Sequence, residues 1–226
     1  VLWINGCAQH SYFFDRCVVH LADEGFLKGG VFFLFFWWLW FRHPDDPRHD
    51  RIDVLRIAGA ICLAVILARA LQILLPGRAR PINDAQLAFV PPFTQTRGYL
   101  EHWSSFPSDH AVVFFALATA IWARYRLLGA FTYAWITLLA LLPRLYTGLH
   151  YPSDLIAGAA IGTLVMAAAD ALPLPRAAMG FIEELISSER WNPAAFYCVA
   201  VAMTYEFIEL FGDVRLVGRA VAKALF

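Results

Sequence analysis

The sequence predicts an all-α membrane protein, a polytopic helix bundle with five to six spanning segments. Hydrophobic residues make up 60% of the 226-residue chain, whereas an ordinary soluble domain is about 45–50% apolar. Mean hydropathy is +0.56, and charged residues account for 16% of the chain, against about 25% in an average protein. The apolar residues lie in long runs, and a helix needs about 20 mostly apolar residues to cross a bilayer. We therefore expect a single membrane domain over residues 1–226.

The first 25 residues are expected to lie on the membrane surface as an amphipathic helix. Polar and charged side chains interrupt this segment throughout. It therefore lacks the clean apolar core of a removable signal peptide and has the mixed character of an interfacial helix.

Five apolar runs are expected to cross the membrane within residues 26–172. The first run ends in a cluster of tryptophans, as expected at a membrane–water interface. Pro76-Gly77 ends the second run, and Pro152 opens the fifth. The predicted spans are residues 26–41, 54–75, 107–123, 128–146 and 152–171.

Residues 173–226 form the C-terminal part of the predicted domain. A charged amphipathic segment over residues 176–190 is followed by an apolar stretch over residues 193–211. This stretch is either a sixth span or a helix on the membrane surface, and the pattern leaves both possibilities open.

Composition argues against several classes of protein. The formal net charge is +0, so no basic surface for nucleic acid is expected. None of the four cysteines belongs to a C-x-x-C pair, which argues against a zinc or redox site. The chain offers no obvious carboxylate cluster for a metal ion. We expect neither a metal nor another cofactor, and the oligomeric state is not indicated.

Three polar islands lie at the edges of the predicted spans, where charged residues usually have a task. Two spans end and two begin on the same side of the membrane, so all three islands share one face although they are far apart in sequence. Histidines, arginines and a carboxylate gathered at one face are suited to hydrolysing a phosphate ester through a histidine intermediate. The islands are Arg78-Ala79-Arg80-Pro81, Pro107-Ser108-Asp109-His110, and Arg144 with His150 and Asp154.

The second island reads as the first turn of a helix. Pro107 suits the first helical position, and the free N–H groups that follow it attract anions. Ser108 can donate its hydroxyl to a phosphate oxygen, and His110 is placed to protonate a leaving oxygen. Taken alone, the same four residues fit a capped helix start equally well.

The third island combines a turn with a helix start. Gly148 permits a sharp turn before the helix that Pro152 opens. Asp154 can then fold back and accept a hydrogen bond from His150, which would fix the imidazole tautomer. Read without the other islands, Asp154 complements the helix dipole and His150 is an interfacial histidine.

The first island places two arginines, Arg78 and Arg80, at a membrane edge. Guanidinium groups bind phosphate oxygens in pairs, although two such side chains can also serve as snorkelling anchors in the headgroup layer.

Basic residues on the opposite face set the predicted orientation. By the positive-inside rule that face is cytoplasmic, so the islands face outward. The C-terminal residues Arg215, Arg219 and Lys223 would oppose this assignment if residues 193–211 span the membrane. The basic residues that support it are Arg42, Arg48, Arg51, Arg124 and Arg126.

The islands resemble the three motifs of the type 2 phosphatidic acid phosphatase superfamily, the lipid phosphate phosphatases: K-x6-R-P, P-S-G-H and S-R-x5-H-x3-D. The resemblance covers roughly residues 5–172 and implies a helix bundle of the acid phosphatase–haloperoxidase type. Three positions depart from the motifs, with Ile73, Asp109 and Pro143 in place of lysine, glycine and serine. The P-S-D-H form and the absent lysine resemble the bacterial undecaprenyl-diphosphatase branch, the bacitracin-resistance type.

This resemblance implies roles for individual residues. His150 would attack phosphorus and form a phosphohistidine, Asp154 would orient it, and His110 would protonate the leaving group. The phosphate oxygens would be held by Arg80, Arg144, Ser108 and the backbone N–H of Asp109, with Arg78 supplying the contact that Ile73 cannot make. Arginines and a helix N-terminus would supply the positive field, so no metal is required.

The leading interpretation is an integral membrane phosphatase that converts undecaprenyl or another isoprenoid diphosphate to the monophosphate. The resemblance places it in a bacterial inner membrane with the site on the periplasmic face. A phosphatase for phosphatidic acid, phosphatidylglycerol phosphate or another lipid phosphate is the alternative within the class. A non-catalytic lipid binder or flippase and a transporter are the alternatives outside it. The expected partners are the lipid substrate and the membrane.

Overall fold

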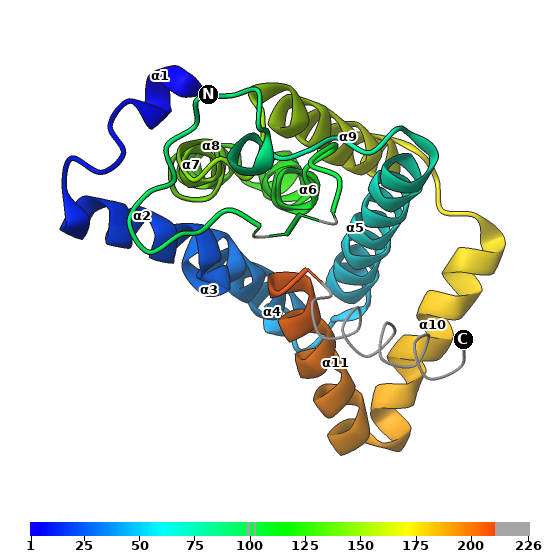
Figure 1. Ribbon diagram of the computed structural model, residues 1–226. Helices are drawn as coiled ribbons and strands as arrows, with labels where there is room; N and C mark the ends of the chain where they lie inside the picture. Colours follow the sequence, from blue (N-terminus) through cyan, green and yellow to red (C-terminus); the bar gives the residue numbers. More distant parts are fainter. Residues whose placement is uncertain (99, 102, 211–226) are drawn as a thin grey trace.

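The computed structural model describes residues 1–98, 100–101 and 103–210, and every regular element in these ranges is helical (Figure 1). The N-terminal half contains α1 (Leu2–Asn5), α2 (Tyr12–Asp23), α3 (Gly25–Lys28), η1 (Gly30–Phe32), α4 (Phe33–Phe41), α5 (Arg48–Leu74) and η2 (Pro81–Asn83). The rest contains α6 (Asp109–Arg124), α7 (Arg126–Ile136), η3 (Thr137–Leu141), α8 (Leu142–Tyr146), α9 (Pro152–Ala171), α10 (Arg176–Trp191) and α11 (Pro193–Ile208).

Three helical segments are long and apolar enough to cross a membrane. They are Arg48–Leu74, Arg126–Tyr146 and Pro152–Ala171, which correspond to the second, fourth and fifth predicted spans. The first predicted span is divided into α3, η1 and α4, and its shorter apolar part runs from Gly30 to Phe41. The all-helical membrane bundle predicted from the sequence is confirmed, with different lengths for its individual segments.

The third predicted span is the central helix of the bundle. α6 has 16 residues, ten of them buried, and it packs against α5, α7 and α9 (Figure 1). At 1.5 Å per residue α6 is about 24 Å long, and it is enclosed by the other helices. This position explains why its apolar residues show little amphipathic pattern.

Two glycines let α9 approach α6 closely. A Cβ atom at Gly162 would lie 2.1 Å from the carbonyl oxygen of Val112, and one at Gly158 would lie 2.5 Å from that of Ser108. Small residues four positions apart commonly permit such contacts between membrane helices. The contact extends to the first turn of both helices, which fixes the start of α6 beside the start of α9.

A partly buried ionic cluster joins the helices at the end of the bundle where α6 ends. Arg124, at the end of α6, pairs with Asp53 on α5 and with Asp170 on α9, at 3.2 Å for the second pair. Its Nε also donates to Asp53 at 2.5 Å. Because one guanidinium joins three helices, their relative positions are fixed at this end as well.

The N-terminal segment differs from the single amphipathic helix predicted over residues 1–25. It forms two helices, α1 and α2, with a non-helical segment between them. Ser11 is the N-cap of α2. Asp15 is completely buried and accepts hydrogen bonds from the hydroxyl of Tyr146 and from the backbone N–H groups of Gln9 and Phe93. These bonds hold the segment against α8 and the connection that follows α5.

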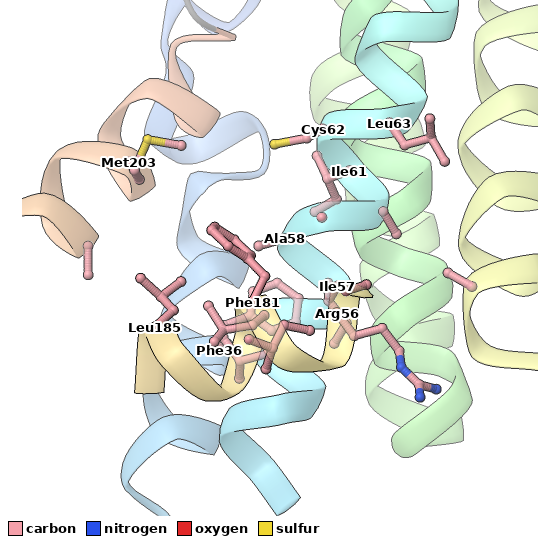
Figure 2. A pocket seen from close by; sticks show the side chains of 18 of the residues that line it. Phe36, Arg56, Ile57, Ala58, Ile61, Cys62, Leu63, Phe181, Leu185 and Met203 are labelled. Atoms are coloured by element: carbon pink, nitrogen blue, oxygen red, sulfur yellow. The ribbon is translucent and has the colours of Figure 1, made fainter. Parts of the chain in front are cut away.

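The C-terminal helices project from the bundle as a V (Figure 1). α10 matches the predicted amphipathic segment, and α11 covers most of the predicted stretch 193–211, whose last residue lies outside the described residues, as do Arg215, Arg219 and Lys223. An apolar cavity of about 990 Å³ separates α10 and α11 from α4 and α5, and Figure 2 shows Phe36, Ile57, Ile61 and Phe181 on its wall. None of the three polar islands contributes to this cavity.

The close approach of α6 and α9 predicts opposite outcomes for two glycine-to-alanine substitutions. Gly162→Ala forces a methyl group against a backbone carbonyl and should destabilise the protein by about 1–3 kcal/mol. Gly59→Ala is the matched control, because a Cβ there meets nothing within 4 Å, and it should be neutral or slightly stabilising. Thermal unfolding in detergent measures both variants, and equal midpoints would contradict the packing described.

Candidate active site

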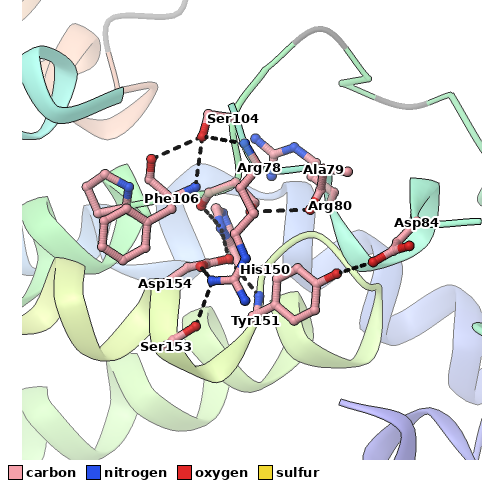
Figure 3. A network of polar contacts seen from close by, with 12 residues as sticks. Arg78, Ala79, Arg80, Asp84, Ser104, Phe106, His150, Tyr151, Ser153 and Asp154 are labelled. Atoms are coloured by element: carbon pink, nitrogen blue, oxygen red, sulfur yellow. Dashed lines mark hydrogen bonds and ion pairs between the residues drawn. The ribbon is translucent and has the colours of Figure 1, made fainter. Parts of the chain in front are cut away.

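The three polar islands meet where α6 and α9 begin, and Figure 3 shows residues of the first and third islands side by side. The backbone N–H of Ser108 donates to the carbonyl of Asp154 at 3.1 Å, which joins the second island to the third. The N–H of Ser105 donates to the carbonyl of Arg78 at 2.9 Å, which joins the approach to the second island with the first. The sequence-based expectation that the islands share one face is therefore confirmed by their geometry.

His150 is buried between these islands, with 4% of its surface exposed. Its Nδ1 lies 2.8 Å from the carbonyl oxygen of Ser105, and a carbonyl oxygen can only accept. Nδ1 therefore carries the proton, which leaves the lone pair on Nε2. This is the tautomer that a nucleophilic histidine needs.

The prediction that His150 donates a hydrogen bond to Asp154 is wrong for this structure. The nearest carboxylate oxygen of Asp154 lies 3.8 Å from Nδ1, beyond hydrogen-bonding distance, because the Ser105 carbonyl occupies the donor. The carboxylate of Asp154 lies beside the imidazole and favours its charged form, and a backbone oxygen fixes the ring orientation.

The surroundings of His150 favour its neutral form. Burial lowers the pKa of His150 to about 4. The carboxylate of Asp154 opposes this shift, and the positive charges of Arg80 and Arg144 reinforce it. The imidazole is consequently uncharged at neutral pH, as a nucleophile must be.

Asp154 is itself held by a small network (Figure 3). One carboxylate oxygen accepts from the backbone N–H of Tyr151 at 2.8 Å, and the other pairs with Arg78 at 2.6 Å. The Arg78 guanidinium also donates to Ser153 and lies 3.9 Å above the ring of Tyr151. Arg78 therefore contacts Asp154 in this structure, and its predicted contact with phosphate stays a prediction.

Ser108 is the N-cap of α6, yet its side chain makes no capping hydrogen bond. Its Oγ is buried and has no hydrogen-bond partner among the described residues. A buried hydroxyl left without a partner costs free energy. An anion at the N-terminus of α6 would satisfy it, which agrees with the predicted role in binding phosphate.

Asp109 faces α5. Its carboxylate pairs with Arg69 at 2.6 Å and accepts a hydrogen bond from Gln72 at 2.9 Å. Gln72 also donates to the carbonyl of Pro107. The negative charge at this position is thus neutralised by α5, while the backbone N–H of Asp109 remains in the first turn of α6.

Two buried arginines lie beside the histidines. Arg80 donates to the carbonyl of Leu149 at 2.7 Å. Arg144 donates to the carbonyl of Ala22 at 3.0 Å, and the same nitrogen lies 2.5 Å from Nε2 of His110. Because arginine stays charged and can only donate, Nε2 of His110 is the acceptor in this arrangement.

Sequence reasoning missed two contributors to the site. Ser105 contributes its backbone carbonyl oxygen, and a pattern of side chains in the sequence cannot predict such a contact. Arg69 lies three residues before Gln72 on one face of α5, so helical periodicity could have placed the pair.

Two of the motif departures have structural explanations. Ile73, at the position of the motif lysine, has 82% of its surface exposed and lies on the outside of the bundle. Pro143 occupies the first turn of α8, where proline is tolerated. Among the described residues, no group of three histidine, cysteine, aspartate or glutamate side chains could hold a metal ion.

The chain is similar to several bacterial proteins. It is 36% identical over 63 residues to the Bacitracin transport permease protein BcrC of Bacillus licheniformis, a match that covers 27% of this chain and 30% of that protein. It is 36% identical to the Lipid A 4'-phosphatase of Bacteroides thetaiotaomicron, covering 48% of each chain. It is 28% identical to the Putative undecaprenyl-diphosphatase YbjG of Escherichia coli, covering 56% of this chain and 58% of that protein.

These matches span about a third to three-fifths of the relatives' own lengths. No solved structure matches the chain. The sequence profile of the PAP2 superfamily matches residues 53–174, a range that runs from α5 to the end of α9 and includes all three islands. The chain belongs to the PAP2 superfamily.

Proposed function

We propose that the protein is a membrane-embedded phosphatase that removes a phosphate group from a lipid through a phosphohistidine on His150. The observation that carries the proposal is the state of this imidazole. The Ser105 carbonyl holds its Nδ1 proton, burial keeps it neutral, and buried arginines lie beside it. A neutral nucleophile next to fixed cations is suited to attack on an anionic phosphorus centre.

In the first step, Nε2 of His150 forms a bond to phosphorus as the bond to the leaving oxygen breaks. His110 gives a proton to that oxygen. Arg144 donates to Nε2 of His110, so the phosphate must draw the guanidinium to itself before Nε2 can take up, from water, the proton that His110 gives to the leaving oxygen. Binding of the phosphate thereby allows His110 to become the general acid.

In the second step, water attacks the phosphohistidine. His110 accepts a proton from the water, the bond between nitrogen and phosphorus breaks, and inorganic phosphate leaves. The phosphate oxygens would be held by Ser108, Arg80, Arg144 and the N–H groups at the start of α6, whose dipole favours negative charge. No step requires a metal ion.

The surroundings of the site favour a lipid over a soluble phosphate ester. Ile73 and Leu74 at the end of α5, and Ile156 in the second turn of α9, are large apolar residues with exposed side chains. They lie at the end of the bundle where the islands meet, so a phosphate in the site would sit beside a surface suited to hydrocarbon chains.

Within this class we propose an isoprenoid diphosphate as the substrate. The Asp109 form of the second motif and the relative named as a Putative undecaprenyl-diphosphatase support this choice. The relatives named as lipid A phosphatases make a lipid A phosphate the second candidate, and a glycerolipid phosphate the third. Basic residues at the opposite end of the bundle, Arg48, Arg51 and Arg124 among them, support an outward-facing site in a bacterial inner membrane.

The proposed function predicts phosphate release by the purified full chain in detergent with EDTA present. Undecaprenyl diphosphate, lipid A and phosphatidic acid are compared side by side, and the isoprenoid diphosphate should be hydrolysed fastest. His150→Ala should lower turnover by about a thousandfold or more. His49→Ala, an exposed histidine at the other end of the bundle, should leave turnover unchanged.

Release from none of the three lipids would support a non-catalytic lipid binder, and undiminished turnover in His150→Ala would remove the nucleophile assignment. Faster release from lipid A or phosphatidic acid would keep the phosphatase and replace the isoprenoid. Loss of activity in EDTA would contradict the metal-free mechanism.

The lowered pKa of His150 predicts an imidazole that stays neutral down to about pH 4, instead of titrating near its usual value of about 6.5. The folded-state pKa is lowered, so the unfolded chain takes up the proton first as pH falls, and stability contributed by this residue is lost between about pH 6.5 and 4. Nuclear magnetic resonance of protein with 13C-labelled histidine rings, assigned with a His150→Gln variant, measures the titration. A midpoint near 6.5 would show that the ring is not buried as described.

A further inference from the structure

Lys28 is a buried cation that belongs to none of the three islands. It is the last residue of α3, it is one of only two lysines in the chain, and 3% of its surface is exposed. Lysine is almost never fully buried without a partner group, so its position requires an explanation.

Hydrogen bonds connect Lys28 to the candidate active site. Its Nζ donates to the carbonyls of Ala22 and Asp23, at 2.9 and 3.0 Å, at the C-terminus of α2. The carbonyl of Ala22 also accepts from Arg144 at 3.0 Å, and Arg144 contacts His110. One oxygen therefore bridges the lysine to the arginine that touches the proposed general acid.

The charges around Lys28 are unbalanced. No described carboxylate forms an ion pair with it, and its ammonium group has three N–H donors, of which two are used. Arg144 is the strongest charged neighbour of Lys28, and Asp23, Glu209 and Glu24 act on it more weakly. Two cations side by side in a buried place favour the arrival of an anion.

We propose that Lys28 is a positioning residue of the phosphate site. Its ammonium group holds the Ala22 carbonyl in place, and this carbonyl also accepts from Arg144. The lysine also adds a second positive charge next to that guanidinium. This inference rests on the proposed function, because the anion in question is the phosphate of the substrate. When phosphate draws Arg144 forward, the charge of Lys28 attracts the phosphate, and the repulsion between the two cations decreases.

A purely structural role is the competing explanation, since a lysine donating to the last carbonyls of a helix caps that helix. The two roles separate when the hydrogen bonds are kept and the charge is removed. Lys28→Gln retains an N–H donor for the carbonyls without a charge, and Lys28→Arg retains the charge. Arg51→Gln is the control for loss of a largely buried cation, because Arg51 pairs with Glu189 at the other end of the bundle.

The test compares these variants with the wild-type full chain in detergent. It measures kcat, KM, inhibition by orthovanadate as a phosphate analogue, and the thermal unfolding midpoint. We expect Lys28→Gln to unfold near the wild-type temperature, to raise KM and to weaken vanadate inhibition about tenfold or more. Lys28→Arg should recover most of the vanadate affinity, and Arg51→Gln should leave KM and vanadate inhibition unchanged.

An active wild-type protein with unchanged KM and vanadate inhibition in Lys28→Gln would overturn the inference and leave the proposed function intact. A lowered unfolding midpoint with unchanged vanadate inhibition would likewise reduce Lys28 to a helix cap. If Lys28→Gln does not fold, loss of vanadate inhibition in Lys28→Arg, with folding retained, would overturn the inference in the same way. An inactive wild-type protein that binds no vanadate would remove the proposed function itself.

Discussion

The close contact between α6 and α9 is the constraint on which the site depends. Gly158 and Gly162 let the two backbones meet, and this brings the N-terminus of α6 against the first turn of α9, where Ser108 donates to the carbonyl of Asp154. The anion-attracting end of one helix and the carboxylate next to the imidazole are thus placed by backbone contacts. Rigid elements hold catalytic groups more accurately than loops do.

Burying positive charge is the second constraint, because a cation in a low-dielectric interior needs compensation. The protein supplies backbone carbonyls for this purpose: Leu149 for Arg80 and Ala22 for both Arg144 and Lys28. Carbonyl oxygens satisfy the N–H donors without cancelling the charge. The cluster therefore stays electropositive, whereas at the opposite end of the bundle Arg124 is neutralised by two aspartates.

The sequence was sufficient to predict much of this arrangement, since hydropathy predicted the long helices, and the order in which the spans end and begin placed the islands on one face. Local pattern could not predict the partners that come from elsewhere in the chain. Asp154 lies four residues from His150, the spacing that suggested a hydrogen bond, yet the imidazole donates to the carbonyl of Ser105 instead. The ion pair of Asp109 with Arg69 and the interrupted first span depend on tertiary packing in the same way.

The central claim is that a phosphoryl group is transferred to His150. It is tested most directly by mixing the protein with 32P-labelled lipid phosphate, quenching at alkaline pH within one turnover, and locating the label by mass spectrometry of the peptide that contains residues 145–154. Label on His150, absent from His150→Ala and lost when the reaction is allowed to complete, is the predicted result. Phosphate release in a single turnover without any labelled histidine would contradict the account and indicate direct attack by water.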